Sequence, residues 1–383
     1  MQYLEFLSHI QPLTLPKIDN YEELLEVLNC IIQQAPTYGS VGPPVYMVLA
    51  QAMNTNEGFN TFLNPELNKQ FKSLFLPWTK FLDSEDSRYV LTTGDGGWFS
   101  GPALTALQEQ FPGKTFFETY ISEDNPETFY GFKSFDDFFN RQFQPGVREL
   151  RFPDAPNVIN AACESSLYNI SRNVGERDQF WLKGEPYSLD HMLAGHYVNE
   201  LTGGTVFQGF LQVTGYHRWH SPVTGTVEKI VPIEGTYFAQ SPAVLNGDYY
   251  GSSPPAPGPD LATNPFLRSL SFITSLTTRL LVFIRSDYAN IGLMCFIAIG
   301  MTEISTCVLN ENIKEGNRVN RGEELGMFRF GGSSHALIFG PNTDLTFFEE
   351  YSRPGQHVRV RDALASVPII PTYVRLYSSG LHD

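Results

Sequence analysis

The feature that most constrains the fold is a series of closely spaced glycines near the end of the chain. Three glycines between residues 316 and 326 precede the stretch Phe330-Gly331-Gly332-Ser333-Ser334-His335, and the apolar residues 336–339 follow it. Glycines at such intervals are typical of short strands joined by tight turns, and a bounded apolar run is typical of a buried strand. The pattern therefore predicts a β-rich region in which Gly332-Ser333 lies where one strand leads into the next. Taken alone, Gly-Gly-Ser-Ser is more often a flexible turn.

The first 130 residues have a different pattern, one that predicts helices. Asn20 and Glu23 have the spacing of a capping box ahead of an apolar stripe, and Asn64-Pro65 combines a cap with a proline at the first helical position. Residues 100–111 predict a third helix. We therefore expect an α+β protein, with a helical N-terminal domain over residues 1–130 and a β-rich sandwich or barrel domain over residues 131–383.

Composition limits the partners of the chain. It has 26 Lys and Arg against 41 Asp and Glu, a formal charge of −15, which opposes binding to nucleic acid or to an anionic membrane. The longest apolar run, residues 291–301, has about half of the ~20 residues that a membrane span needs. The N-terminus has an acidic residue, Glu5, where a signal peptide needs basic residues. We therefore expect a cytoplasmic protein that acts on a small molecule and is not inserted into a membrane.

Four cysteines show neither CxxC pairing nor metal-ligand spacing, so we expect reduced thiols and no metal site. Glu164 follows a predicted strand over residues 157–162, a position where a carboxylate is usually solvated or a cap. His217 and His220 lie three residues apart among aromatic residues. Because no cluster of further ligands accompanies them, acid-base chemistry suits these histidines better than metal binding.

Several of these stretches, taken in order, resemble the pyruvoyl-dependent phosphatidylserine decarboxylase family. The resemblance covers about residues 131–340 and rests on SFDDFFNR, the strand that ends at Cys163-Glu164-Ser165, KGEPYSLDHMLAG, GYHRWHSPVTG, VPIEGTYF and LGMFRFGGSS. Members of this family cut their own chain at a Gly-Ser bond, and the serine becomes a covalent pyruvoyl group. The resemblance therefore implies cleavage between Gly332 and Ser333 and a pyruvoyl cofactor derived from Ser333.

The resemblance also implies roles for other residues. Ser333 matches the family's attacking serine, His220 the histidine that removes its proton, and Glu164 the acid that orients that histidine, although the family has aspartate there. Acid members of Ser-His-acid triads vary between Asp and Glu. His217 matches the histidine that the family uses to return a proton after CO₂ leaves. The two self-cleaved chains are expected to stay associated, and the oligomeric state is left open, a homo-oligomer included.

Within the family, the chain resembles the fungal branch that includes the L-tryptophan decarboxylase of the psilocybin pathway. The shared features are the extra N-terminal helical region and the stretches NAACES, GMTEIS and GGSSH. Gly215 stands where the phospholipid enzymes usually carry an aspartate. We therefore expect an enzyme that decarboxylates a free aromatic L-amino acid, with L-tryptophan giving tryptamine. The alternatives are a phosphatidylserine decarboxylase that makes phosphatidylethanolamine and an uncleaved, non-catalytic binding relative.

Overall fold

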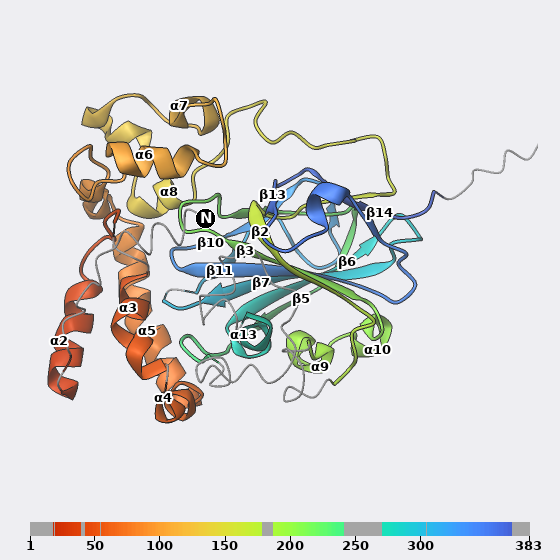
Figure 1. The fold of residues 1–383 in the computed structure, drawn as a ribbon, viewed down its shortest axis with the longest axis horizontal. Coiled ribbons are helices and arrows are strands. Elements are labelled where there is room, and N and C mark those ends of the chain that lie inside the picture. The colour runs from red at the N-terminus through yellow and green to blue at the C-terminus, as the bar shows by residue number, and fades with distance from the viewer. Residues whose placement is uncertain are drawn as a thin grey trace, which may run out of the picture.

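The computed structural model describes residues 18, 20–39, 43–53, 55–177, 187–240, 270–303 and 305–369. Its centre is an antiparallel eight-stranded sheet with the strand order β13-β2-β3-β11-β7-β6-β5-β9 (Figure 1). Two smaller sheets have the orders β1-β14-β12 and β4-β10-β8. The Gly- and Pro-rich stretch 251–259, which the sequence predicts to be a surface loop, lies outside the described residues. The strands are β1 (Val158–Asn160), β2 (Ser165–Arg172), β3 (Thr205–Leu211), β4 (Arg218–His220), β5 (Gly225–Ile233), β6 (Arg279–Ser286), β7 (Leu293–Met301), β8 (Cys307–Leu309), β9 (Arg318–Val319), β10 (Glu324–Phe328), β11 (Gly332–Phe339), β12 (Thr346–Phe347), β13 (His357–Val358) and β14 (Ala363–Ser366).

The helices of the N-terminal region begin where their sequences predict. Asn20 Oδ1 accepts a hydrogen bond from the backbone N–H of Glu23 at 2.9 Å, and Asn64 Oδ1 accepts one from Glu66 at 2.9 Å. The predicted helix over residues 100–111 is α6. The helices are α2 (Tyr21–Ile31), α3 (Pro44–Met53), α4 (Asn56–Phe62), α5 (Pro65–Leu82), α6 (Gly101–Gln108), α7 (Phe116–Thr119), α8 (Phe135–Phe139), α9 (Leu189–Leu193), α10 (Val198–Leu201) and α13 (Leu270–Leu276), with 3-10 helices η1 (Glu85–Val90), η2 (Pro126–Gly131) and η4 (Glu349–Tyr351).

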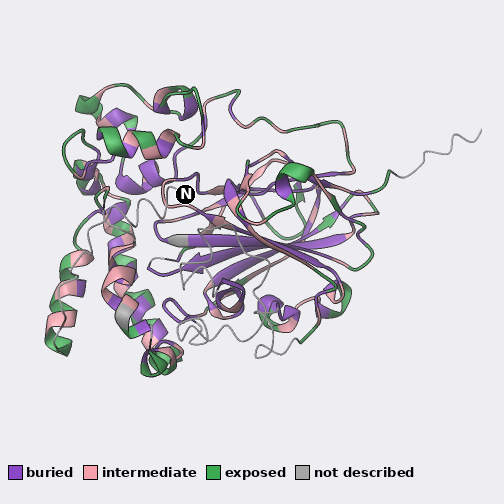
Figure 2. Cartoon of the chain, in the orientation of Figure 1, coloured by how far each residue is buried: buried purple, intermediate pink, exposed green. Residues whose placement is uncertain are grey.

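The central sheet is covered on both faces, so its middle strands are buried along most of their length (Figure 2). Along β11, Ala336 and Ile338 pack into the core shared with the helices, while Leu337 and Phe339 pack into a second core against the smaller sheets. This alternation follows from the two-residue period of a strand. The α+β class predicted from the sequence is confirmed.

The N-terminal helices share the first of these cores with the sheet. Trp78 of α5 and Phe135 of α8 both contact the ring of Phe330, with centroids 5.9 Å and 5.4 Å away. Phe330 lies just before the Gly-Gly-Ser sequence. The helices therefore pack directly against the segment that leads into β11.

Candidate active site

Ser333 lies near the start of β11, between two neighbouring strands. Its register partners are Leu211 of β3 and Gly300 of β7, and Gly332 is opposite Met301. The side chain is 1% exposed, and its Oγ has no hydrogen-bond partner among the described residues. Leaving a buried hydroxyl unpaired costs about 1–3 kcal/mol. Such a group is a candidate for chemistry, because packing alone does not require it.

The backbone before Ser333 has a shape that only glycine adopts without strain. Gly331 has φ +146°, and a Cβ at this residue would lie 2.3 Å from the carbonyl oxygen of Glu303. Gly332 is the residue next to the serine. The structure shows a steric requirement one residue earlier, at Gly331, because the loop after β7 packs against it.

A second unpaired group shares the strand face of Ser333. His335 follows two residues later, is 1% exposed, and neither of its ring nitrogens has a partner among the described residues. The ring lies between Phe207 and Phe296, with centroids 5.9 Å and 6.2 Å away, and burial lowers its pKa to about 3. A Cβ at Gly209 would lie 2.6 Å from His335 Cε1, so glycine makes room for the imidazole.

His220, the predicted base, lies at the end of β4 and is not hydrogen-bonded to Ser333. Its Nε2 is 3.1 Å from Tyr216 Oη and its Nδ1 is 3.1 Å from the carbonyl oxygen of Gly322. Nδ1 also lies 3.2 Å from Arg361 Nη2, which can only donate, whereas the carbonyl can only accept, so each tautomer of His220 satisfies one of the two contacts at Nδ1. Burial and the nearby charge of Arg361 hold the pKa of His220 well below its ordinary value. The imidazole is therefore neutral, and its Nε2 is occupied by the hydrogen bond with Tyr216.

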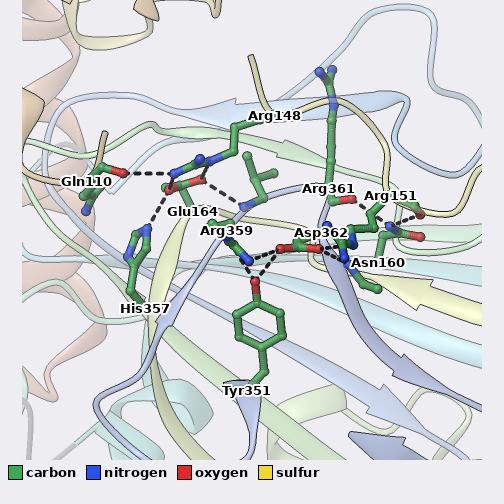
Figure 3. A network of polar contacts seen from close by, with 12 residues as sticks. Gln110, Arg148, Arg151, Asn160, Glu164, Tyr351, His357, Arg359, Arg361 and Asp362 are labelled. Carbon is green, nitrogen blue, oxygen red and sulfur yellow. Dashed lines mark hydrogen bonds and ion pairs between the residues drawn. The ribbon is translucent and has the colours of Figure 1, made fainter. Parts of the chain in front are cut away.

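Glu164, the predicted acid, lies immediately before β2, but the expected hydrogen bond to His220 is not formed. Its Oε1 accepts from Arg148 Nη2 at 2.6 Å and lies 2.7 Å from His357 Nε2, and its Oε2 accepts from Arg148 Nε and from the Val360 N–H, both at 2.9 Å (Figure 3). Burial raises the pKa of the carboxyl, but His357 and Arg148 outweigh this effect and bring the pKa below its ordinary value. Glu164 is thus a buried carboxylate paired with a different histidine from the predicted one.

Glu164 and His220 are connected indirectly through the segment that follows β13. Val360 donates its N–H to Glu164, and the next residue, Arg361, has Nη2 3.2 Å from His220 Nδ1. The contacts of His357 and Arg148 with Glu164, and of Arg361 with His220, were not predicted from the sequence. The alternation His-Val-Arg-Val-Arg over residues 357–361 is a signal for a strand with one polar face, but it does not identify the partner of that face.

His217, the predicted proton donor, lies on the side of the site that the helices cover. Its ring stacks on Phe139 of α8 with centroids 3.9 Å apart, and Phe139 contacts Phe330 at 5.4 Å. Burial and the charge of Arg141 lower the pKa of His217 to about 3, so the imidazole is neutral. Arg141 Nη2 donates a hydrogen bond to the carbonyl oxygen of Gly215 at 2.8 Å. Gly215 is the residue that stands where the phospholipid enzymes usually carry an aspartate.

The side chains and helices of the described residues limit the class of site. No group of three or more His, Cys, Asp or Glu side chains there could hold a metal ion. None of the helices in the described part of the chain has the length and apolar character that a membrane crossing requires. All four cysteines are free thiols.

Comparison with known proteins agrees with the order of motifs along the chain. A family model described as phosphatidylserine decarboxylase matches residues 135–366, and a second model of that description matches residues 5–107. L-Tryptophan decarboxylase from Psilocybe cubensis is 42% identical over 359 residues, which cover 91% of this chain and 79% of the relative. Decarboxylase iboD from Amanita muscaria is 42% identical over 334 residues, which cover 85% of this chain and 91% of the relative.

A phospholipid enzyme is a more distant relative. Phosphatidylserine decarboxylase proenzyme 3 from Schizosaccharomyces pombe is 29% identical over 264 residues, which cover 68% of this chain and 24% of the relative. The first family model spans both sides of the Gly332-Ser333 bond and includes Glu164, His217 and His220. The chain belongs to the phosphatidylserine decarboxylase family and is a decarboxylase, a carboxy-lyase.

Proposed function

We propose that this protein decarboxylates a free aromatic L-amino acid and that its reaction is the conversion of L-tryptophan to tryptamine. The observation that carries the proposal is the 42% identity, over 91% of this chain, to a relative named for its action on L-tryptophan. A second relative of that name, from Psilocybe cyanescens, is 43% identical over 88% of this chain. The identity to the phosphatidylserine enzyme is 29%, which favours the amino acid over the phospholipid.

The proposed cofactor is a pyruvoyl group made from Ser333 by cleavage of the Gly332–Ser333 bond. Ser333 fits this role because its buried Oγ has no partner among the described residues and because Gly331 gives the preceding backbone a conformation closed to other residues. Attack of Oγ on the Gly332 carbonyl moves the acyl group from nitrogen to oxygen. Elimination of the ester then releases residues 1–332 as a carboxylate, and water replaces the nitrogen of the resulting dehydroalanine, which leaves as ammonia. When formed, the group supplies an electron sink for the pair left by CO₂.

Three further side chains have proposed roles. His220 is the base that takes the proton of Ser333, which requires Nε2 to exchange its bond with Tyr216 for one with the serine. Glu164 is a positioning residue. It accepts a hydrogen bond from the Val360 N–H, and the next residue, Arg361, contacts His220. His217, packed beside the aromatic residues before the cleavage site, is neutral at rest, so it first takes a proton from the substrate ammonium and returns a proton to the carbanion after CO₂ leaves.

The sheet supports the expectation that the cleaved chains stay together. Residues 333–339 of β11 belong to the C-terminal chain, and they pair with β3 and β7 of the N-terminal chain. Separating the chains would therefore expose two rows of backbone hydrogen-bonding groups and the apolar side chains of β11. A cytoplasmic location is also proposed, because the four free thiols suit a reducing compartment.

The test combines a mass measurement with a substrate panel. Denatured wild-type protein should give two species, residues 1–332 and a pyruvoyl-blocked chain from residue 333, while Ser333→Ala and His220→Ala should give one full-length species. The wild type should release CO₂ from L-tryptophan without added pyridoxal phosphate and should be inhibited by hydroxylamine. Turnover of phosphatidylserine vesicles without turnover of any free aromatic amino acid would identify the lipid enzyme instead. An intact wild-type chain without activity would identify a binding relative.

A further inference from the structure

The loop that follows β7 lies directly beside the proposed cleavage site. The carbonyl oxygen of Glu303 is the atom that a Cβ on Gly331 would strike at 2.3 Å. Thr302 adopts φ +61°, a left-handed conformation that costs energy in a β-branched residue. Ser305 Oγ donates to the Thr302 carbonyl at 2.5 Å, and the Thr302 N–H donates to the Tyr237 carbonyl at 3.1 Å. The loop is therefore held in a defined shape where it touches Gly331.

The side chain of Glu303 leaves this loop and ends at the first turn of α3. Its Oε1 accepts from the Val45 N–H at 2.7 Å and its Oε2 accepts from the Tyr46 N–H at 3.0 Å. The residue is 0% exposed. The first N–H groups of a helix have no partner within the helix, and they favour a negative group. The carboxyl therefore joins an N-terminal helix to residues that lie 258 positions later in the chain.

Capping of α3 explains the contact, but it does not explain why the capping carboxyl comes from a residue 258 positions later in the chain. Asn64 caps α5 in the ordinary way, from the residue adjacent to its own helix, through bonds to Glu66 and Leu67. Glu303 caps α3 from the loop whose backbone fixes the position of Gly331. Movement of α3 is therefore passed through Glu303 to the backbone beside the cleavage site. Asn64 caps the N-terminus of α5, whereas Trp78, which contacts Phe330, lies near the other end of that helix.

We propose that Glu303 is a positioning residue for self-cleavage, because it ties α3 to the loop that holds the Gly331-Gly332 backbone for attack by Ser333. The inference rests on the proposed self-cleavage. It also assigns the N-terminal helices a part in maturation. A displacement of about 1 Å at a reacting centre can slow a reaction ~100-fold, so losing this tie should be visible in the cleavage rate.

The main test measures the rate of cleavage of freshly translated protein by intact mass. Glu303→Ala should cleave about 10- to 100-fold more slowly than wild type. Glu303→Gln, which keeps an acceptor oxygen and nearly the same volume, should stay within a few-fold of wild type at pH 6. Asn64→Ala is the matched control: it also removes a side-chain oxygen that caps an N-terminal helix, and it should cleave at the wild-type rate.

The pH dependence of the cleavage rate distinguishes a positioning role of Glu303 from a general loss of stability in its variants. Burial raises the pKa of Glu303 to about 7 from an ordinary 4.5. The bonds from Val45 and Tyr46 favour the ionised form, but burial outweighs them. A buried carboxyl with a raised pKa is favoured over an exposed one below pH 4.5, and this advantage is lost between pH 4.5 and pH 7, so ionisation favours conformations in which Glu303 leaves α3. The cleavage rate of wild type relative to Glu303→Gln should therefore fall between pH 5 and pH 7, because glutamine does not titrate.

Other titratable groups around Glu303 should not reproduce this change. They are Tyr46 on α3, Tyr237 beside Thr302, Cys307 in β8, and Arg329 before Gly331. The pKa values of Tyr237 and Cys307 are raised to about 12 by burial. Arg329 lies 3.8 Å from Asp136, whose pKa burial raises to about 6. The same ratio measured in an Asp136→Asn background should keep its fall between pH 5 and pH 7, which assigns the change to Glu303.

Each outcome decides the proposal. Wild-type cleavage with an equal rate in Glu303→Ala would refute the positioning role and leave the proposed function intact, whereas an uncleaved wild type would refute both. Equal slowing in Asn64→Ala would show that any loss of N-terminal helix stability has the same effect and would also refute it. If Glu303→Ala does not fold, the pH profile of Glu303→Gln decides, and a ratio that does not change with pH overturns the proposal.

Discussion

Replacing Glu164 by glutamine should destabilise the protein far more than an ordinary loss of one charge. The carboxylate is fully buried and is bonded to Arg148, whose side chain is 16% exposed, as well as to His357 and the Val360 N–H. Removing one partner of a buried ion pair costs about 3–5 kcal/mol, because the other charge is left without compensation. Glutamine keeps one acceptor oxygen, so we expect the lower end, about 3 kcal/mol. With ~2.1 cal/mol/K per residue of unfolding entropy, this lowers the melting temperature by about 4 °C.

The measurement is thermal and urea unfolding in a Ser333→Ala background, so that self-cleavage does not contribute. Glu234→Gln is the matched control, because Glu234 pairs with Lys72 and its side chain is 71% exposed. An exposed pair of this kind contributes about 0–1 kcal/mol. A loss in Glu164→Gln no greater than in Glu234→Gln would refute the reasoning.

The effect should also depend on pH in one direction. Since the pKa of Glu164 lies below its ordinary 4.5 in the folded protein, the stability it contributes is present above pH 4.5 and is lost as pH falls through the lower folded value. The difference between wild type and Glu164→Gln should therefore shrink between pH 5 and pH 3. A difference that stays constant over this range would show that the carboxylate charge does not cause it.

Three further predictions concern the residues around the cleavage site. Gly331→Ala should slow or abolish cleavage in protein that still folds, because its Cβ would meet the Glu303 carbonyl at 2.3 Å; intact mass would show a single full-length chain, and normal cleavage would contradict the packing argument. His217→Ala should still cleave but lose about 100-fold or more in decarboxylation, measured as CO₂ release, and failure to cleave would assign His217 to maturation. Tyr216→Phe should cleave at least as fast as wild type, because it frees Nε2 of His220, and slower cleavage in a time course would show that the phenol holds the ring in place.

The local features of the fold could be predicted from the sequence. The caps at Asn20 and Asn64 depend on residues two or three positions away, and the strand after Ser333 on a short apolar run, so each is encoded within a few neighbouring residues. The order of motifs over about residues 131–340 likewise identified the family, whose model matches residues 135–366. These predictions succeeded because the interactions behind them do not require the chain to be folded.

Only the tertiary structure decided which side chains meet at the site. Glu164 pairs with His357, 193 positions later, and its separation from His220 depends on β13 lying beside β2. The contact of Glu303 with α3 likewise joins distant segments. No short-range pattern encodes such partners, because a buried carboxylate is stabilised by whichever donors the packed sheets and helices bring to it. The residue types at the site are therefore determined by the sequence, and their pairing and protonation are determined by burial and strand register.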